Sequence, residues 1–345
     1  METMSALIFD APGKIHVDEL PVPEPGPGDI LMRVRATSIC YSDIRVYKGE
    51  KKAKAGVIPG HEIAGEIEAM GSEVEGFSIG QRITLCPILA CGECYYCMTG
   101  KRNRCVSRTT LGYEENGGLA HYVLIPEQLV KLGHVIPLSD TLSFEVASLT
   151  EPFACVLNSL ESCRVQPGST LAVIGGGPMG LIHVLLAAAI GCPQIIVSDP
   201  VEERLAWAKE LGATMTVNPK KESLEQVTMK ATDGLGADAV VLSVGTVDAI
   251  ADGLAVVRKQ GYYNLFGGFP PSSRFDLDPN RIHYDEIFIT GTQNATPDQY
   301  FRSAKLLSAI PNAAKLITHR FGPKDADGAY RARLDMSGLK TTVIY

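Results

Sequence analysis

The chain has 345 residues, of which 45% are hydrophobic and 21% charged, as in an ordinary globular protein of about two domains. Its formal net charge of −7 offers no basic field to attract nucleic acid or an anionic membrane, so we expect partners of neither kind. Residues 1–14 contain no basic segment followed by a long apolar run, and the apolar run 181–190 is too short to cross a bilayer. These features predict a cytoplasmic protein.

Residues 1–150 are predicted to form mainly strands and turns, with strand-like order in residues 30–36, 65–71 and 118–125. Two motifs near these segments carry side chains that bind metals: Cys40-Tyr-Ser42-Asp43 and Gly60-His61-Glu62. A cysteine, a histidine and carboxylates are ligands of open zinc sites, in which one position is left for water or substrate. Each residue alone is a weak signal, because a single cysteine or histidine is more often part of a core. Combined with a dinucleotide-binding fold, they indicate a catalytic metal site.

Four cysteines then follow within fifteen positions: Cys91, Cys94, Cys97 and Cys105. Short spacers of this kind allow four thiolates to converge on one tetrahedral ion, and a closed four-sulfur zinc site is structural. The bacterial iron–sulfur pattern needs a three-residue final spacer followed by proline, whereas this spacer has seven residues and Val106 follows. Disulfides are disfavoured because the other five cysteines are scattered singly. The spacing therefore predicts structural zinc in a lobe at 86–106.

From about Thr170 the pattern changes to an alternation of strands and helices. We expect strands at 170–174, 194–198, 237–244, 262–266 and 287–292, and helices at 178–190, 201–211 and 247–257. Such alternation predicts a parallel sheet with right-handed crossovers. After about Gly291 the chain is expected to return to the first domain, which would make that domain discontinuous.

A glycine-rich loop opens the first of these helices: Gly175-Gly-Gly177-Pro178-Met179-Gly180. The glycine motif alone is a weak signal, but here it directly follows a predicted strand and opens a helix, and this context predicts a dinucleotide-binding site. Gly175 permits the tight turn, Gly177 lets a pyrophosphate approach the backbone, and Gly180 allows close packing of helix and strand. Asp199 follows the next predicted strand, 19 positions after Gly180. In dinucleotide-binding folds a carboxylate at about this spacing accepts hydrogen bonds from the adenosine ribose hydroxyls. The carboxylate would repel a 2′-phosphate, so NAD is predicted rather than NADP.

Taken together, these motifs resemble the zinc-dependent medium-chain dehydrogenase/reductase family, and most closely its sorbitol (polyol) dehydrogenase-like branch. The resemblance covers essentially the full length and also includes Gly65, Gly117-Gly118-x-Ala120 and Glu151-Pro152. It implies an α/β fold: a Rossmann doubly wound parallel sheet plus a discontinuous β-rich GroES-like catalytic domain with the structural zinc lobe. The catalytic domain would comprise residues 1–152 and 291–345, and the NAD-binding domain residues 153–290.

The resemblance also implies residue roles. Two zinc ions per chain are expected, one structural in the four-cysteine lobe and one catalytic. The catalytic ion would be held by Cys40, His61, Glu62 and Glu151, with Glu62 as a ligand or an exchanging neighbour. Ser42 would take the hydroxyl proton of the substrate. Besides the glycine loop and Asp199, the NAD-binding residues would include Arg204, Val244, Phe266 and Thr292.

Three positions depart from the family's pattern. Tyr41 replaces a glycine and either shapes the substrate pocket or simply packs. Arg45 stands five residues after Cys40, where many relatives carry a histidine that ends a proton relay. Arginine stays protonated, so Arg45 is expected to bind the cofactor pyrophosphate or an anionic substrate group instead. Cys155 lies four residues after Glu151, so the fourth zinc ligand is left open among Glu151, Cys155 and water.

The implied activity is the reversible, zinc- and NAD-dependent oxidation of a secondary alcohol of a polyol or sugar alcohol to the ketone. Hydride would pass to nicotinamide from a zinc-bound alkoxide. A polyol-phosphate, cyclitol or L-threonine dehydrogenase of the same family is an alternative. A non-catalytic NAD-binding protein with structural zinc only is the alternative of another class. A homodimer or homotetramer is expected by resemblance. The sequence does not determine the polyol, its stereochemistry, its phosphorylation or the physiological direction.

Overall fold

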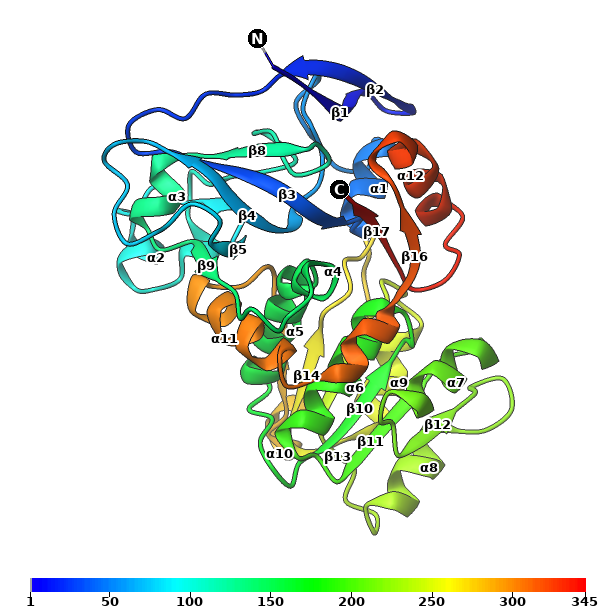
Figure 1. Ribbon diagram of the computed structural model, residues 1–345. Coiled ribbons are helices and arrows are strands. Elements are labelled where there is room, and N and C mark those ends of the chain that lie inside the picture. Colours follow the sequence, from blue (N-terminus) through cyan, green and yellow to red (C-terminus); the bar gives the residue numbers. More distant parts are fainter. Residues whose placement is uncertain (1) are drawn as a thin grey trace. The chain divides into compact units, whose positions relative to one another are not determined.

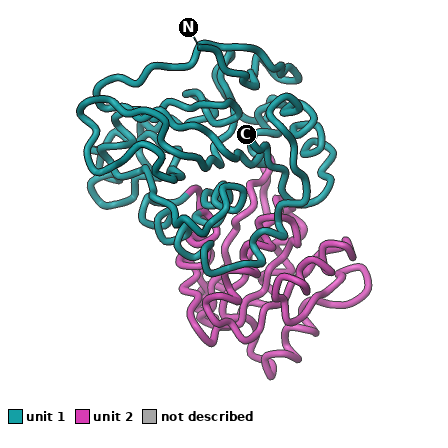
Figure 2. The backbone as a smooth tube through the Cα atoms, viewed as in Figure 1, with its two compact units in different colours: residues 1–154, 295–345 teal, residues 155–294 magenta. Residues whose placement is uncertain are grey.

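The computed structural model describes residues 2–345 and divides the chain into two compact units (Figure 2). The first unit comprises Met1–Ala154 together with Ala295–Tyr345, and the second comprises Cys155–Asn294. The first unit is therefore discontinuous in sequence. Within the described residues, no helix combines the length and the apolar character that a membrane span requires.

A seven-stranded sheet organises the first unit (Figure 1). Its strands follow the order β16-β17-β3-β4-β5-β9, and β8 pairs with β3. Their bounds are β3 Ile30–Ser38, β4 Glu62–Met70, β5 Arg82–Leu85, β8 Tyr122–Ile125, β9 Val135–Pro137, β16 Ile317–Phe321 and β17 Lys340–Ile344. The C-terminal strand β17 lies beside β3, with Thr342 opposite Ser38. The last residues of the chain thus complete a sheet begun near its start, and this brings Lys340 to the end of β4 that carries Glu62.

Shorter elements surround this sheet. Two antiparallel pairs are formed by β1 Thr3–Ala11 with β2 Lys14–Pro21, and by β6 Ile88–Leu89 with β7 Thr109–Thr110. The helices are α1 Tyr41–Tyr47, α2 Tyr95–Met98, α3 Glu127–Lys131, α4 Phe144–Ala147, α11 Pro297–Leu307 and α12 Ala326–Leu334, with short 3-10 turns at Arg102–Arg104, Pro311–Leu316 and Pro323–Asp325. Apolar residues of alternate strand positions, including Ile30, Met32, Ile63, Ile67 and Ile83, form a buried core against the sheet.

The second unit is built on a six-stranded parallel sheet of order β12-β11-β10-β13-β14-β15. Its strands are β10 Thr170–Ile174, β11 Gln194–Ser198, β12 Met215–Val217, β13 Ala237–Leu242, β14 Val257–Leu265 and β15 Phe288–Thr290. The order reverses direction at β10, which is the doubly wound arrangement that places ligands at the carboxyl ends of the central strands. The predicted Rossmann fold is confirmed.

Helices connect these strands and pack on the sheet (Figure 1). They are α6 Pro178–Ile190, α7 Glu202–Glu210, α8 Leu224–Ala231, α9 Ala249–Val256 and α10 Pro279–Asp285, and α5 Thr150–Ser162 begins in the first unit and continues into the second. Strands β10 and β11 and helix α6 have the bounds expected from the sequence. All five residues of β10 are buried, which explains why its sequence is continuously apolar and does not alternate.

Candidate active site

The glycine-rich loop links β10 to α6 and is shaped by its glycines. Gly175 has φ +105°, and a Cβ atom there would lie 2.6 Å from Val244 Cγ1. A Cβ on Gly180 would lie 1.8 Å from the carbonyl oxygen of Gly175, so only glycine fits both positions. Gly177 differs: it caps α6, and no atom lies within 4 Å of the place its Cβ would occupy. The space beside Gly177, at a helix N-terminus with free amides, fits a pyrophosphate.

Asp199 is held at the carboxyl end of β11, next to this loop. Its side chain is buried, and its oxygens accept hydrogen bonds from the backbone N–H of Gly176 (2.8 Å) and of Val201 (2.8 Å). Arg204 lies beside it, with Nη1 3.5 Å from Asp199 Oδ2. A negative charge is thus fixed at the place where a dinucleotide presents its adenosine ribose, and a cation stands within reach of it.

The remaining predicted cofactor residues follow the carboxyl ends of neighbouring strands. Val244 comes after β13, Phe266 after β14 and Thr292 after β15. Phe266 packs edge-on against the His183 ring at 4.9 Å, and Thr292 Oγ1 accepts a hydrogen bond of 3.4 Å from Asn264. Pro178 and Met179 form the first turn of α6. The fold therefore brings this set to the sheet edge where open α/β proteins bind dinucleotides.

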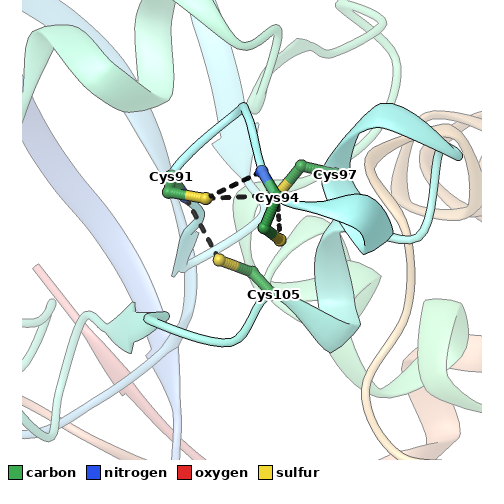
Figure 3. Close-up of side chains that lie close together, drawn as sticks. All are labelled: Cys91, Cys94, Cys97 and Cys105. Carbon is green, nitrogen blue, oxygen red and sulfur yellow. Dashed lines mark hydrogen bonds between the residues drawn. The ribbon is translucent and has the colours of Figure 1, made fainter.

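The four-cysteine lobe forms a compact sulfur cluster (Figure 3). The sulfurs of Cys91, Cys94, Cys97 and Cys105 all lie within 4.8 Å of one another. The Cys91–Cys97 separation is 3.9 Å and the Cys94–Cys97 separation is 3.6 Å. A tetrahedron with zinc–sulfur bonds of about 2.3 Å has edges of about 3.8 Å. The measured separations match that figure, and none of the four cysteines forms a disulfide.

Backbone amides point at several of these sulfurs and favour the ionised form of the cysteines they contact. The N–H of Cys91 lies 3.2 Å from Cys105 Sγ, and the N–H of Cys94 lies 3.3 Å from Cys91 Sγ. Hydrogen bonds from the backbone N–H groups of Val106 and Cys97 lower the pKa of the Cys94 thiol to about 6. Burial, in contrast, raises the pKa of the Cys97 thiol to about 12. Because zinc binds thiolates and not thiols, the amide contacts favour metal binding most at Cys94. The cluster fits a structural zinc site.

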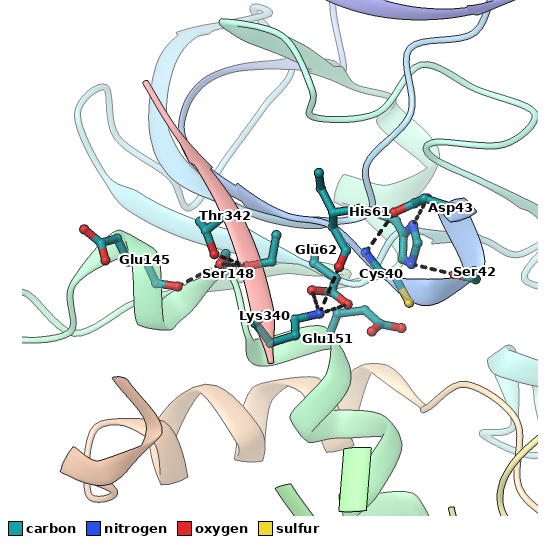
Figure 4. A network of polar contacts seen from close by, with 12 residues as sticks. Cys40, Ser42, Asp43, His61, Glu62, Glu145, Ser148, Glu151, Lys340 and Thr342 are labelled. Carbon is teal, nitrogen blue, oxygen red and sulfur yellow. Dashed lines mark hydrogen bonds and ion pairs between the residues drawn. The ribbon is translucent and has the colours of Figure 1, made fainter. Parts of the chain in front are cut away.

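A second group of metal-binding side chains gathers in the first unit (Figure 4). Cys40 lies at the N-terminus of α1, His61 precedes β4, and Glu62 is the first residue of β4. One ligand atom from each of the three lies within 4.8 Å of the others, and His61 and Glu62 are buried. The structure thus brings together three of the residues that the sequence motifs single out.

Asp43 orients His61. Its carboxylate lies 3.2 Å from His61 Nδ1 and accepts a 3.0 Å hydrogen bond from the backbone N–H of Cys40. Nε2 has long contacts of 3.4 Å to the Ser42 and Tyr113 hydroxyls, and these weak hydrogen bonds would compete little with a metal for this nitrogen. Burial disfavours charge on His61, but the negative charge of Asp43 outweighs it and raises the His61 pKa well above the ordinary value. The same charge favours a metal cation at this position.

Tyr113 and Ser42 form a hydroxyl pair beside this ring. Their oxygens are 2.6 Å apart, and the Tyr113 ring packs at 5.0 Å from the His61 ring. Burial, together with the negative charges of Asp43 and Cys40, raises the Tyr113 pKa well above its usual value, so the hydroxyl keeps its proton. Ser42 therefore has a fixed hydrogen-bond partner that either donates or accepts.

Glu62 is paired with Lys340. Both carboxylate oxygens contact Lys340 Nζ, at 2.7 Å and 2.5 Å, and both side chains are buried. Lys340, which lies near the C-terminus, thus holds the Glu62 carboxylate in place near Cys40 and His61. Its negative charge is already balanced, which favours a supporting position over permanent metal ligation.

Glu151 is not among the three clustered ligand residues. It is the second residue of α5, and the Tyr300 hydroxyl donates a 3.5 Å hydrogen bond to its Oε1. Figure 4 shows its side chain reaching the same region as Glu62 and Lys340. Burial raises the Glu62 pKa, the charge of Lys340 opposes this shift, and the charge of Glu151 adds to it. Cys155 lies one turn further along the same helix. A fourth ligand from Glu151 or Cys155 stays a prediction.

Arg45 and Tyr41, which depart from the family's pattern, each contact a neighbouring side chain. Arg45 lies in the last turn of α1, with Nε 3.4 Å from Glu50 Oε2, so its guanidinium is already paired with a carboxylate. Tyr41 is 40% exposed, and the Arg333 guanidinium lies 5.7 Å from the centre of its ring.

Sequence reasoning did not find Tyr113 or Lys340. Tyr113 lies 52 positions from His61, and Lys340 lies 278 positions from Glu62. Neither belongs to a motif with a fixed spacing to its partner. The sequence carries no local signal that could have identified them.

A cluster of metal-binding side chains beside a hydroxyl pair, a four-cysteine lobe and a doubly wound nucleotide-binding unit are together typical of a zinc-containing dehydrogenase. Comparisons with known proteins agree. Residues 26–135 match the alcohol dehydrogenase GroES-like domain, and residues 178–309 match the zinc-binding dehydrogenase domain. The chain belongs to the zinc-dependent medium-chain dehydrogenase/reductase family, as an oxidoreductase similar to its sorbitol dehydrogenase branch.

Individual relatives cover nearly the whole chain. A sorbitol dehydrogenase from Halalkalibacterium halodurans is 33% identical over 95% of this chain and 96% of its own length. A D-arabitol-phosphate dehydrogenase from Enterococcus avium is 34% identical over 93% and 91%. A crystal structure of a zinc-binding dehydrogenase from Sinorhizobium meliloti, bound to NADP, superposes with a TM-score of 0.93 at 28% identity and covers 100% of both chains.

Proposed function

We propose that the protein catalyses the reversible, zinc- and NAD-dependent oxidation of a secondary alcohol of a polyol or sugar-derived substrate to the ketone. The observation that carries this proposal is the convergence of Cys40 and His61 next to the Ser42 hydroxyl. Asp43 supports it, because its carboxylate holds the Nδ1 side of the His61 ring while Nε2 faces Ser42, and its negative charge favours a metal cation beside the ring. The metal would be held by Cys40 and His61, with Glu62 or Glu151 completing or exchanging at the site.

When bound, zinc supplies a Lewis acid for the alcohol oxygen and NAD supplies the hydride acceptor. The chain's own groups handle the proton. Ser42 Oγ accepts the proton of the substrate hydroxyl while its own proton is released to water, the final proton acceptor. Tyr113, 2.6 Å away, fixes the direction in which the Ser42 hydroxyl points. In the reverse direction the same pair returns the proton to the ketone oxygen.

For the cofactor we propose NAD over NADP. Asp199 carries a fixed negative charge that would oppose a 2′-phosphate, and two backbone N–H groups keep the carboxylate in position. Arg204 weakens this discrimination because its guanidinium lies 3.5 Å from the same carboxylate. The relative from Sinorhizobium meliloti holds NADP, so both cofactors belong in any assay.

We further propose a homodimer or homotetramer in the cytoplasm. Within the part of the chain that the structure describes, strand β15 is the last strand of its sheet and pairs only with β14, and Phe288 on it is 49% exposed. An unpaired edge with an exposed aromatic side chain suits pairing with a second copy. Light scattering of the wild type and of Phe288→Lys tests this assembly. A wild-type monomer would contradict it.

A substrate panel tests the activity. The zinc-loaded protein is given polyols, cyclitols, their phosphates and L-threonine with NAD, and nicotinamide reduction is followed by absorbance. Turnover with a secondary alcohol supports the proposal. If no alcohol in the panel is oxidised and the protein binds one zinc and NAD, the alternative of a non-catalytic NAD-binding protein is favoured.

A further inference from the structure

The proposed active site contains a lysine that no motif predicted and that no carboxylate neutralises. Lys51 lies just beyond α1, and its backbone N–H donates a 3.2 Å hydrogen bond to the carbonyl of Arg45. Its side chain is half-buried, and its ammonium lies 3.3 Å from the centre of the Tyr113 ring. The Tyr113 hydroxyl in turn bonds to Ser42 and faces His61. Lys51 therefore stands on the aromatic wall of the site that handles the reacting alcohol.

The other cations near this site have ionic partners. Arg45 is paired with Glu50 at 3.4 Å, and Lys340 with Glu62 at 2.7 Å. Among residues 2–345, no carboxylate lies within 4.0 Å of the Lys51 ammonium, and its close partner is an aromatic face. A cation–π contact of this kind contributes about 0.5–2 kcal/mol and leaves the three N–H donors of the ammonium unsatisfied by acceptors.

The electrostatic setting of Lys51 is consistent with a position facing the site. Burial lowers the Lys51 pKa, and the negative charges of Cys40, Asp43, Glu114 and Glu151 oppose that shift. A partly desolvated ammonium that lacks an ionic partner gains most from an anion that a ligand brings.

We propose that Lys51 binds an anionic group of the substrate, so that the preferred substrates are secondary alcohols carrying a phosphate monoester or a carboxylate. The proposal rests on the proposed function and narrows it. It assigns anion recognition to Lys51 and not to Arg45, whose guanidinium is already engaged by Glu50. Tyr113 positions Lys51, because its ring holds the Lys51 ammonium beside the hydroxyl of Ser42.

Matched substrates test this proposal. The zinc-loaded enzyme is assayed with D-arabitol, D-arabitol phosphate and the corresponding aldonate, which differ in the charged group. For Lys51→Met we expect KM for the preferred anionic alcohol to rise roughly 10- to 100-fold, as for loss of a hydrogen bond to a charged group. KM for D-arabitol and kcat should change less than about threefold. Whether the phosphate or the carboxylate shows the loss identifies the source of the anion.

Two further variants separate charge from packing. Lys51→Arg keeps the cation and should retain most of the preference for the anionic alcohol. Lys52→Met is the matched control, because Lys52 is the adjacent exposed lysine, and it should behave as the wild type. Equal KM changes for neutral and anionic substrates in Lys51→Met, or a wild type that prefers D-arabitol over both charged compounds, would overturn the proposal.

A binding measurement distinguishes this proposal from the proposed function. Calorimetry of the same three compounds with the zinc-loaded protein, without NAD, reports recognition independently of turnover. If anionic alcohols bind to the wild type more tightly than to Lys51→Met but none is oxidised, the proposed dehydrogenase activity is contradicted and the proposal for Lys51 is supported. If D-arabitol is oxidised but the charged compounds bind no better to the wild type than to Lys51→Met, only the Lys51 assignment fails.

Discussion

Lys340 Nζ lies 2.7 Å from Glu62 Oε1, and the two buried residues come from opposite ends of the chain, 278 positions apart. The pair joins the first residue of β17 to the first residue of β4. Since Glu62 neighbours His61, the position of the C-terminal strand is linked directly to the geometry of the metal-binding cluster.

Removing the lysine should therefore be costly. Lys340→Met leaves a buried carboxylate without its cation, and loss of one partner of a buried ion pair costs about 3–5 kcal/mol. The double variant Lys340→Met/Glu62→Gln should recover part of this loss, because no unpaired charge remains. Denaturant unfolding at fixed zinc concentration measures both. Lys14→Met, at an exposed lysine, is the control. A cost below about 1 kcal/mol for Lys340→Met would contradict a tight buried pair.

Asp43 should act on the metal through His61. Asp43→Asn keeps the shape of the side chain but removes the negative charge 3.2 Å from His61 Nδ1. Loss of such a supporting carboxylate lowers metal affinity about 10- to 100-fold. Competition with a chelator measures the affinity of the catalytic zinc, and Asp10→Asn, at an exposed aspartate, is the control. Unchanged zinc affinity would show that Asp43 does not orient the histidine.

The four-cysteine lobe should hold its own zinc. Cys97→Ser should reduce the metal content from two zinc ions per chain to one and lower the melting temperature, because a structural zinc contributes directly to folding. Cys86→Ser, at a buried cysteine that is not one of the four clustered sulfurs, should keep both ions. Elemental analysis of the purified variants measures the number of zinc ions per chain. Two zinc ions retained by Cys97→Ser would exclude the four-sulfur site.

Asp199 should control the choice of cofactor. Asp199→Ala removes the charge that opposes a 2′-phosphate and frees Arg204, which lies 3.5 Å away. We expect the affinity ratio of NADH to NADPH to fall at least about tenfold, roughly the effect of one charge–charge contact. Fluorescence titration with each cofactor gives the ratio, with Glu203→Ala as the control. An unchanged ratio would show that Asp199 does not contact the ribose.

His183 should make the protein sensitive to acid. The side chain is fully buried between the Met179 carbonyl (2.7 Å) and the Ser159 hydroxyl (3.0 Å), and burial lowers its pKa to about 4. In the unfolded chain the His183 ring takes up a proton near pH 6.5, whereas in the folded protein it does so only near pH 4. The free energy of unfolding therefore has its full value above about pH 6.5 and falls progressively as the pH is lowered toward 4. The expected loss is about 3 kcal/mol.

Unfolding of wild type and His183→Gln between pH 7 and 4 tests this interpretation. The variant should show a shallower decline of stability over that interval, although it is less stable at pH 7. Parallel pH profiles for the two proteins would mean that His183 does not stay neutral in the fold.

Much of the second unit could be predicted from the sequence. The continuously apolar segment of β10, the proline and glycine that bound α6, and the acid that follows β11 are local signals, and they placed the glycine-rich loop between β10 and α6. Strand β12 and helix α8 were not predicted. Met215–Val217 is only three residues long, too short for a periodic pattern to develop.

The metal-binding cluster was only partly predictable. Cys40, His61 and Glu62 stand in recognisable motifs, and the structure brings their ligand atoms together. Lys340, Tyr113 and Lys51 reach the same region through strand pairing and loop packing between distant segments. Their identity depends on the register of β17 with β3 and on the turn after β7, which no local spacing in the sequence reports.

The most direct test of the whole account replaces Cys40 by serine. We predict that the wild type binds two zinc ions per chain and oxidises a secondary alcohol with NAD. Cys40→Ser should bind one zinc, lose turnover by at least about a thousandfold, and keep its affinity for NAD, because a thiolate ligand is lost from the catalytic site only. A Cys40→Ser protein with two tightly bound zinc ions and the wild-type rate would contradict the account.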